Sequence, residues 1–580
     1  MNPAKPLSIV ALLLMLLAGQ LSAQTSQTDD DITTSAIAQP AIVARLFPAI
    51  VAGSSALWVG MGQAMAGQPQ VNCAWTSTSG NSVTDSRVAA SFNTESGDLW
   101  VVWTKGSGGT CAAPTADALV YAYISLDSAV GIRCLFAQPQ CILGTTKAAG
   151  AAGANKLPGV TETSLPAFIR SIFNNQRVNI AATDILPADA KFATYSALAA
   201  CGLLGKGSQF AGLGYGPGPI GTRISSYYSN KSVGVVDFNI FGNDPINTDQ
   251  PIPSYTVIPI GAAPELVVVN TSNHNGFGSS AVNGINRAIL GLYFGGIFGR
   301  TADLLPQPFA GASESYFPTT ALLPGPLSGE YQIFEHSIAN NKEIYRPQEY
   351  GNCGAAGTYT VQSNPLNLSR TIGSTNSFRR RVIGTGEMVS TLQTVQDSIG
   401  YALWSSGNFN RTSNIKYLTV DGIDPILDTY TNGTVPQSGN GLLRRVTLSH
   451  VKDGTYPVWS MLRLVSYDAG TPAAATMALA AQLLDHFGSD TTHPDFVPLL
   501  QLRAFHAHYA PSFVNFNAGN VASDGQLVCG LLSVPEAGGD VGGMVFSLQA
   551  GADYCVLQGN YGNSKTGVGP TNTSPFGVRQ

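Results

Sequence analysis

Hydrophobic residues in this chain fall into short continuous runs that end in small polar loops. The runs Leu99–Trp103 and Val120–Ile124 are rich in β-branched and aromatic residues and lie between Gly/Ser/Thr turns, so they predict β-strands. An earlier apolar run reaches Val51 and breaks into a loop of small residues, which leads into the helix-like segment Val59–Met65. The pattern therefore predicts successive strand, loop and helix units.

Longer apolar segments follow further along the chain. Arg177–Asp184 predicts a short strand that ends in a carboxylate, and Thr256–Asn270 predicts a strand long enough to cross between two domains. Ile399–Trp404 predicts a second crossing strand, whereas Ile285–Phe298 and Thr471–Phe487 have helical periodicity. Strands that alternate with helices predict α/β layers with a binding site at the strand ends.

One stretch predicts a helix N-terminus that is suited to an anion. A Pro/Gly-rich approach delivers Ser328 and Gly329 to a segment in which Tyr331, Phe334 and Ile338 recur at helical spacing. Such an end offers unpaired N–H groups and the positive pole of the helix dipole, and a glycine lets a ligand approach the backbone. The alternative is an ordinary serine N-cap without a ligand.

The start of the chain predicts export. Met1–Lys5 carry a positive charge, Leu7–Ala18 form an apolar run too short to span a bilayer, and Leu21–Ala23 form a small-residue cleavage site. We therefore expect a signal peptide over residues 1–23, a polar disordered leader over 24–40, and a periplasmic or extracellular protein that does not span the membrane after the signal is removed.

Eight cysteines in an exported chain favour disulfides over metal binding, because no C-x-x-C spacing occurs. Eight thiols allow 105 connectivities, which sequence alone does not resolve. The pairs that we predict from proximity in the chain are Cys73 with Cys111 and Cys529 with Cys555.

Composition narrows the class of protein further. Hydrophobic residues make up 44% of the 580 residues, enough for two or more cores, whereas charged residues make up only 11%, about half the usual share. The net charge of −5 and the lack of a basic stripe argue against nucleic acid as a partner. The one basic run, Arg379–Arg381, fits a solvated face.

The order of these loops resembles that of a known family. The motifs that carry the resemblance are a Ser-rich first loop, Ser125–Gly131, Ala182–Asp184, Val257–Asn270, Leu327–Gly329, Gly386–Tyr401 with Asp397–Tyr401 inside it, Lys416–Pro425 and Tyr456–Trp459. In this order they resemble the phosphate-type periplasmic substrate-binding proteins of ABC transporters. The resemblance implies an α/β, two-lobed, type 2 periplasmic-binding fold with the ligand between lobes that two crossing strands connect.

The resemblance also implies a ligand site and a domain division. The residues that fall where the family contacts its oxyanion are Ser54, Ser55, Ser128, Asp184, Ser328 and Gly329, and Glu330 follows them. The expected domains are lobe 1 over 41–262 with a β-rich insertion at 70–150, lobe 2 over 263–398, the return of lobe 1 over 399–470, and a C-terminal extension over 471–580.

Two positions depart from the family pattern. Glu330 stands where the family has threonine, and Pro324–Pro326 stand where an arginine precedes the motif. An ionised Asp184 acts only as an acceptor, so a ligand oxygen that faces it must carry a proton, which favours hydrogen phosphate over sulfate. A second carboxylate at Glu330 repels the anion, so we expect phosphate to bind more strongly in mild acid.

The leading expectation is a non-enzymatic solute-binding protein for a small inorganic anion, with an ABC transporter permease as its partner. It needs no cofactor and no metal, and we assign no catalytic residue, because no G-x-S-x-G or H-E-x-x-H motif occurs. The alternatives are a secreted or surface interaction protein that keeps the fold without the phosphate site, and an enzyme such as a phosphatase.

Overall fold

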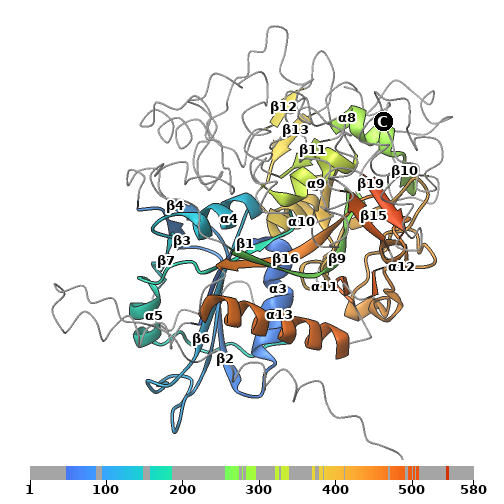
Figure 1. Ribbon diagram of the computed structural model, residues 1–580. Coiled ribbons are helices and arrows are strands. Elements are labelled where there is room, and N and C mark those ends of the chain that lie inside the picture. Colours follow the sequence, from blue (N-terminus) through green and yellow to red (C-terminus); the bar gives the residue numbers. More distant parts are fainter. Residues whose placement is uncertain are drawn as a thin grey trace, which may run out of the picture. The chain divides into compact units, whose positions relative to one another are not determined.

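A computed structural model describes part of the chain (Figure 1). The described residues are 48–86, 94–147, 157, 159–185, 255–272, 277, 282–294, 320–324, 328–338, 369–371, 378–382, 384–410, 412–467, 471–489, 494–498, 501–502, 504–507 and 544–547. The predicted signal peptide, the leader at 24–40, and Cys201, Cys353, Cys529 and Cys555 lie outside them.

The first group of strands is built around β1, which is buried along its whole length. Strand β1 lies between β6 and β8 and is parallel to both, and the antiparallel strands β5 and β2 continue the sheet beyond β6. Continuous apolar runs are expected of parallel strands, because both faces of such a sheet are covered. The bounds are β1 Ala49–Ser54, β2 Val71–Ser77, β5 Leu99–Thr104, β6 Val120–Leu126 and β8 Ile180–Thr183.

A long strand, β9, belongs to both groups of strands. Its first half pairs with β16, which also pairs with β8, and its second half pairs with β14 and β15. Strands β11, β13 and β12 follow β14, so that the order is β12-β13-β11-β14-β9-β16-β8-β1-β6-β5-β2. The bounds are β9 Tyr255–Asn270, β11 Thr320–Leu323, β12 Ser369–Thr371, β13 Phe378–Arg381, β14 Ser398–Leu403, β15 Ile415–Val420 and β16 Trp459–Tyr467.

Smaller strands complete the described sheets. Strands β3, β4 and β7 form a separate antiparallel sheet, β10 pairs with β15, β17 pairs with β9, and β18 pairs with β19. Their bounds are β3 Asn81–Thr84, β4 Thr94–Ser96, β7 Ile142–Thr145, β10 Gly284–Ile285, β17 Val497–Pro498, β18 Ala504–Ala507 and β19 Met544–Ser547. The predicted β-rich stretch at 70–150 thus contains β2 to β7.

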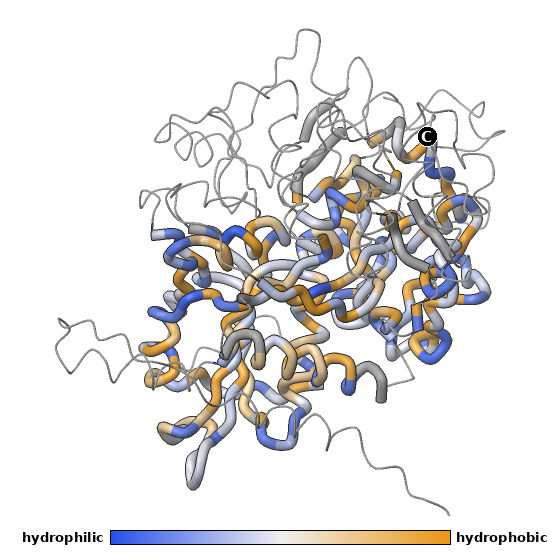
Figure 2. The backbone as a smooth tube through the Cα atoms, in the orientation of Figure 1, coloured by the Kyte–Doolittle hydropathy of each residue, from blue (hydrophilic) through white to orange (hydrophobic). Residues whose placement is uncertain are grey.

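Helices follow several of the parallel strands. Helix α3 follows β1 and α4 follows β6, and α13 packs against α3, β16 and β9. The bounds are α3 Ser55–Ala66, α4 Ser128–Phe136, α5 Ala167–Phe173, α8 Arg287–Phe294, α9 Gly329–Ser337, α10 Gly384–Thr394, α11 Ser406–Phe409, α12 Ser449–Lys452 and α13 Thr471–Ser489, with short 3₁₀ turns at Ser438–Asn440 and Leu443–Arg445. The main hydrophobic core is formed by apolar residues of the central strands and of α3, α9, α10 and α13, and Figure 2 shows how hydrophobic residues are distributed along the chain.

The strand order confirms the predicted α/β class, with two groups of strands joined by a long crossing strand. The sequence predicted a helix from Val59, but α3 begins at Ser55, directly after β1. The reason is local, because the Ser54 hydroxyl caps the helix by accepting a hydrogen bond from the N–H of Ala56 at 3.2 Å. The proposed lobe boundaries at 262, 398 and 470 stay a prediction.

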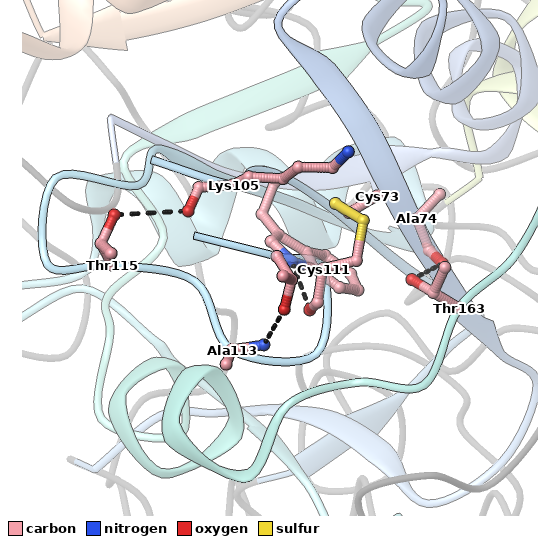
Figure 3. Close-up of a disulfide and its surroundings, with 9 residues drawn as sticks. Cys73, Ala74, Lys105, Cys111, Ala113, Thr115 and Thr163 are labelled. Atoms are coloured by element: carbon pink, nitrogen blue, oxygen red, sulfur yellow. Dashed lines mark hydrogen bonds between the residues drawn. A yellow bond between two sulfur atoms is a disulfide. The ribbon is translucent and has the colours of Figure 1, made fainter. Parts of the chain in front are cut away.

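Two disulfides join elements in the N-terminal part of the described chain. The predicted Cys73–Cys111 bond is confirmed and ties β2 to the loop between β5 and β6, with a Cα–Cα distance of 5.5 Å (Figure 3). In the same loop the Thr115 hydroxyl donates to the Lys105 carbonyl at 3.4 Å. A second bond, Cys134–Cys141, joins the end of α4 to the start of β7 and was not predicted.

Candidate functional site

The site begins at the turn from β1 into α3. Gly53 has φ +134°, and a Cβ there would lie 2.0 Å from the Ala182 carbonyl oxygen, so only glycine fits between β1 and β8. The next residue, Ser54, is buried, and its hydroxyl donates to Asp184 Oδ2 at 3.1 Å. The tight turn therefore fixes the first hydroxyl of the site on a carboxyl group 130 residues away.

The turn from β6 into α4 supplies the second hydroxyl. Ser128 is the first residue of α4, and its hydroxyl donates to Asp184 Oδ1. The N–H of Asp184 in turn donates to the Ser128 hydroxyl at 3.4 Å. Strands β6, β1 and β8 are parallel neighbours, so their carboxyl ends meet at one edge of the sheet. This arrangement brings together Ser54, Ser128 and Asp184, which the family resemblance grouped as ligand contacts, and their role in binding stays a prediction.

The N-terminus of α9 completes the surroundings of Asp184. Ser328 is the N-cap by position but makes no side-chain capping bond, and it is buried. A Cβ built on Gly329 would lie 1.5 Å from Asp184 Oδ1, so the carboxyl group rests directly on the Gly329 backbone. A helix N-terminus favours a negative group, and in this structure that group is the side chain of Asp184.

Glu330, in the first turn of α9, is 1% exposed. Its Oε1 accepts hydrogen bonds from the Leu403 N–H at 3.2 Å and from the Thr385 hydroxyl, whereas Oε2 is buried without a hydrogen-bond partner in the described part of the chain. Burial raises the pKa of Glu330 to about 7; the hydrogen bond from Thr385 opposes this rise, and the negative charge of Asp184 adds to it.

Ser55 links to the same cluster through α10. Its hydroxyl lies 2.8 Å from the Thr385 hydroxyl and accepts the Thr385 N–H at 3.0 Å. Thr385, which sequence reasoning missed, then donates to Glu330. A chain of hydrogen bonds therefore runs from Ser55, at the start of α3, through Thr385, 330 positions later, to Glu330 at the start of α9.

Sequence reasoning also missed Glu265, which lies in β9 opposite Leu403 of β14. Its side chain is 0% exposed, and neither carboxyl oxygen has a hydrogen-bond partner in the described residues. Burial raises its pKa well above the ordinary value, and the charges of Glu330 and Asp184 raise it further. The signal in the sequence was a single carboxylate within the apolar run Thr256–Asn270.

The described cluster therefore combines three buried carboxyl groups with four hydroxyl groups. The carboxyl groups belong to Asp184, Glu265 and Glu330, and the hydroxyl groups to Ser54, Ser55, Ser128 and Thr385. No set of three or more His, Cys, Asp or Glu side chains that suits a metal ion occurs in the described ranges. Among the described helices, none is long and apolar enough to cross a bilayer. The groups available for chemistry are hydroxyl and backbone donors together with carboxyls that accept when ionised and donate when protonated.

No protein-family model matches this chain, and no curated protein sequence matches it. Among solved structures, a phosphate-binding protein from Stenotrophomonas maltophilia is 13% identical over 80% of this chain and 93% of its own, with a TM-score of 0.32. A human phosphate binding apolipoprotein is 11% identical, with 82% and 96% covered and a TM-score of 0.31. An ABC-type phosphate transport receptor from Vibrio cholerae is 13% identical, with 40% and 72% covered and a TM-score of 0.24. The likeness is distant and carries no conclusion about the ligand or activity of this chain.

Proposed function

We propose that this chain is an exported, non-enzymatic solute-binding protein that captures a small oxyanion, a hydrogen phosphate species, where Asp184 meets α9. The observation that supports it is the convergence of two serine hydroxyls and a helix N-terminus on one buried carboxyl group. These three elements already hold a negative group in a buried place, and they are the donors that an oxyanion requires.

Capture of an anion requires these donors to change partners. The hydroxyls of Ser54 and Ser128 donate to Asp184, so an oxyanion competes with that carboxylate for them. Once displaced from these donors, Asp184 serves as an acceptor for a ligand O–H group. Sulfate carries no proton at neutral pH, so the proposal includes a preference for hydrogen phosphate over sulfate.

Export and delivery belong to the same proposal. The charged start, the apolar run and the small-residue cleavage site support export, and the two disulfides fit an oxidising compartment. An ABC transporter permease is the partner that a solute-binding protein of this kind would serve. The described cluster contains hydroxyl and carboxyl groups without a histidine, lysine or thiol, and this set supports binding better than nucleophilic catalysis.

One observation favours a second candidate, a secreted or surface interaction protein that keeps the fold without the anion. The Asp184 carboxyl group itself occupies the N-terminus of α9 and uses both serine hydroxyls. The hydrogen-bond donors of the site are therefore already bonded to Asp184. The neighbouring carboxyl groups of Glu265 and Glu330 supply no positive charge that would attract an anion.

Titration calorimetry with inorganic phosphate and with sulfate, at pH values from about 5 to about 8, separates the two candidates. We expect phosphate to bind, sulfate to bind far more weakly, and Asp184→Asn to lose the preference because the amide no longer demands a ligand proton. The matched control is Asp117→Asn, which alters an exposed carboxylate in the loop before β6. Absence of heat with either anion across this pH range would reject the oxyanion proposal and favour the interaction protein.

A further inference from the structure

Burial of the Glu265 carboxyl group destabilises the fold, and no hydrogen bond from the described residues offsets this loss of stability. Its carboxyl group is completely buried, and both oxygens lack a hydrogen-bond partner among the described residues. A buried polar group without a partner destabilises a fold. The main chain of this residue is fully engaged, because its N–H donates to the Val458 carbonyl and its carbonyl accepts from the Tyr456 hydroxyl at 2.7 Å. Only the side chain lacks a partner.

The geometry places this side chain in the candidate site. Glu265 is the direct partner of Leu403 in the β9–β14 ladder, and the N–H of Leu403 donates to Glu330 Oε1. Glu330 follows Gly329, on which the Asp184 carboxyl group rests. The Glu265 carboxyl group interacts electrostatically with those of Glu330 and Asp184, so the oxygens without a partner, Glu265 Oε1, Glu265 Oε2 and Glu330 Oε2, lie in the same region as the serine hydroxyls that bind Asp184.

The charged and titratable groups around Glu265 come from several elements. Glu330 faces it from α9, Asp184 from the end of β8, and the Tyr456 hydroxyl from the segment before β16. Closely spaced carboxyls in a buried place cannot all ionise, so protons remain on part of the group. A protonated carboxyl has an O–H to donate.

We propose that Glu265 and Glu330 are ligand-binding residues that hold protons and donate their O–H groups to the oxyanion, so that anion capture is coupled to proton uptake. The inference rests on the proposed function and assigns the protons of that site. In mildly alkaline solution Glu330 is largely ionised, and the incoming anion forces one proton from solvent onto its carboxyl group. Burial favours the protonated form of Glu265, which provides a second O–H donor for the anion.

Two substitutions of Glu265 test its role. Glu265→Leu removes the donor at similar volume, and we expect phosphate affinity to fall at least about tenfold while the urea midpoint rises, because a buried polar group without a partner is gone. Glu265→Gln keeps an N–H donor and should bind phosphate nearly as the unaltered protein does. A purely structural role predicts the opposite pattern, in which Glu265→Leu is destabilised and its affinity is unchanged.

Calorimetry in two buffers of different ionisation enthalpy measures the proton count on phosphate binding. At about pH 8 we expect the unaltered protein to take up about one proton more than Glu330→Gln, whose amide is neutral throughout, and at about pH 5 we expect no difference between them. Asp117→Asn should match the unaltered protein at both values. Equal proton counts for the two proteins at both pH values would overturn the coupling.

The two proposals fail in different ways. If the unaltered protein binds no phosphate at any pH, the oxyanion function is rejected and this inference is rejected with it. If the unaltered protein binds phosphate and Glu265→Leu binds it equally well, the function stands and the assignment of Glu265 is wrong.

Discussion

Glu330 should make the stability of this protein depend on pH in a direction opposite to that of an ordinary surface carboxylate. Its pKa is raised from 4.5 to about 7 in the folded chain, chiefly by burial. Between these two values the unfolded chain has lost the proton while the folded chain retains it. Stability is therefore greatest below the unfolded value, falls as the pH rises through this window, and changes no further above about pH 7.

The magnitude follows from the size of the shift. A rise of about 2.5 units, from 4.5 to about 7, corresponds at about 1.4 kcal/mol per unit to roughly 3 kcal/mol of lost stability. The group is completely buried, so solvent does not screen this contribution. Glu330→Gln keeps an oxygen for the Leu403 N–H and the Thr385 hydroxyl but cannot ionise. The variant should match the unaltered protein near pH 4.5 and exceed its stability by up to about 3 kcal/mol at pH 8.

Urea unfolding followed by tryptophan fluorescence, repeated at several pH values, measures this difference directly. The difference between the unfolding free energies of the two proteins at each pH removes the contribution of every titrating group that the substitution leaves unchanged. The control Asp117→Asn alters an exposed carboxylate and should show no step between about pH 5 and pH 8. A constant difference between Glu330→Gln and the unaltered protein over this range would refute the reasoning, because the carboxyl group would then be ionised in both states.

Two further results follow from contacts in the structure. Gly329→Ala places a Cβ 1.5 Å from Asp184 Oδ1, so thermal unfolding should show a loss of about 1–3 kcal/mol, whereas Gly386→Ala in α10, with nothing within 4 Å, should be neutral or stabilising. Replacing both cysteines of the Cys73–Cys111 bond by serine opens a span of 38 residues and should cost about 4 kcal/mol in urea unfolding, against about 2 kcal/mol for the 7-residue span of Cys134–Cys141. Equal stability of the two glycine variants, or a larger loss from the shorter span, would contradict these assignments.

The sequence predicted those parts of the site that depend on local patterns. Apolar runs that end in small polar loops predicted the strands that precede these loops, and the family resemblance selected Ser54, Ser128 and Asp184 within them. Parallel pairing of the strands brings the three residues together. Helical spacing after Ser328 placed the N-terminus of α9 correctly. These features were accessible because each depends on a few neighbouring residues and on the rule that the ends of parallel strands share one edge.

The remaining parts depend on contacts between distant segments. Thr385 joins the site because it bonds to Ser55, 330 positions earlier, and no local pattern marks it. Glu265 stands in a run that is apolar on both sides, and periodicity does not say which face of a doubly buried strand its side chain occupies. The position of the Asp184 carboxyl group on Gly329 likewise results from the packing of β8 against the start of α9.

The position of Glu330 explains why its protonation depends on the negative groups that lie at the N-terminus of α9. A carboxylate in the first turn of a helix is ordinarily stabilised by the helix dipole, which lowers its pKa. Here the pKa rises instead, because the helix end is buried and the Asp184 carboxyl group already lies against the first residue of α9. The two hydrogen bonds to Glu330 favour its ionised form and are outweighed. Any negative group at this helix end, whether Asp184 or a captured oxyanion, therefore favours the protonated form of Glu330, and by reciprocity a protonated Glu330 favours the anion.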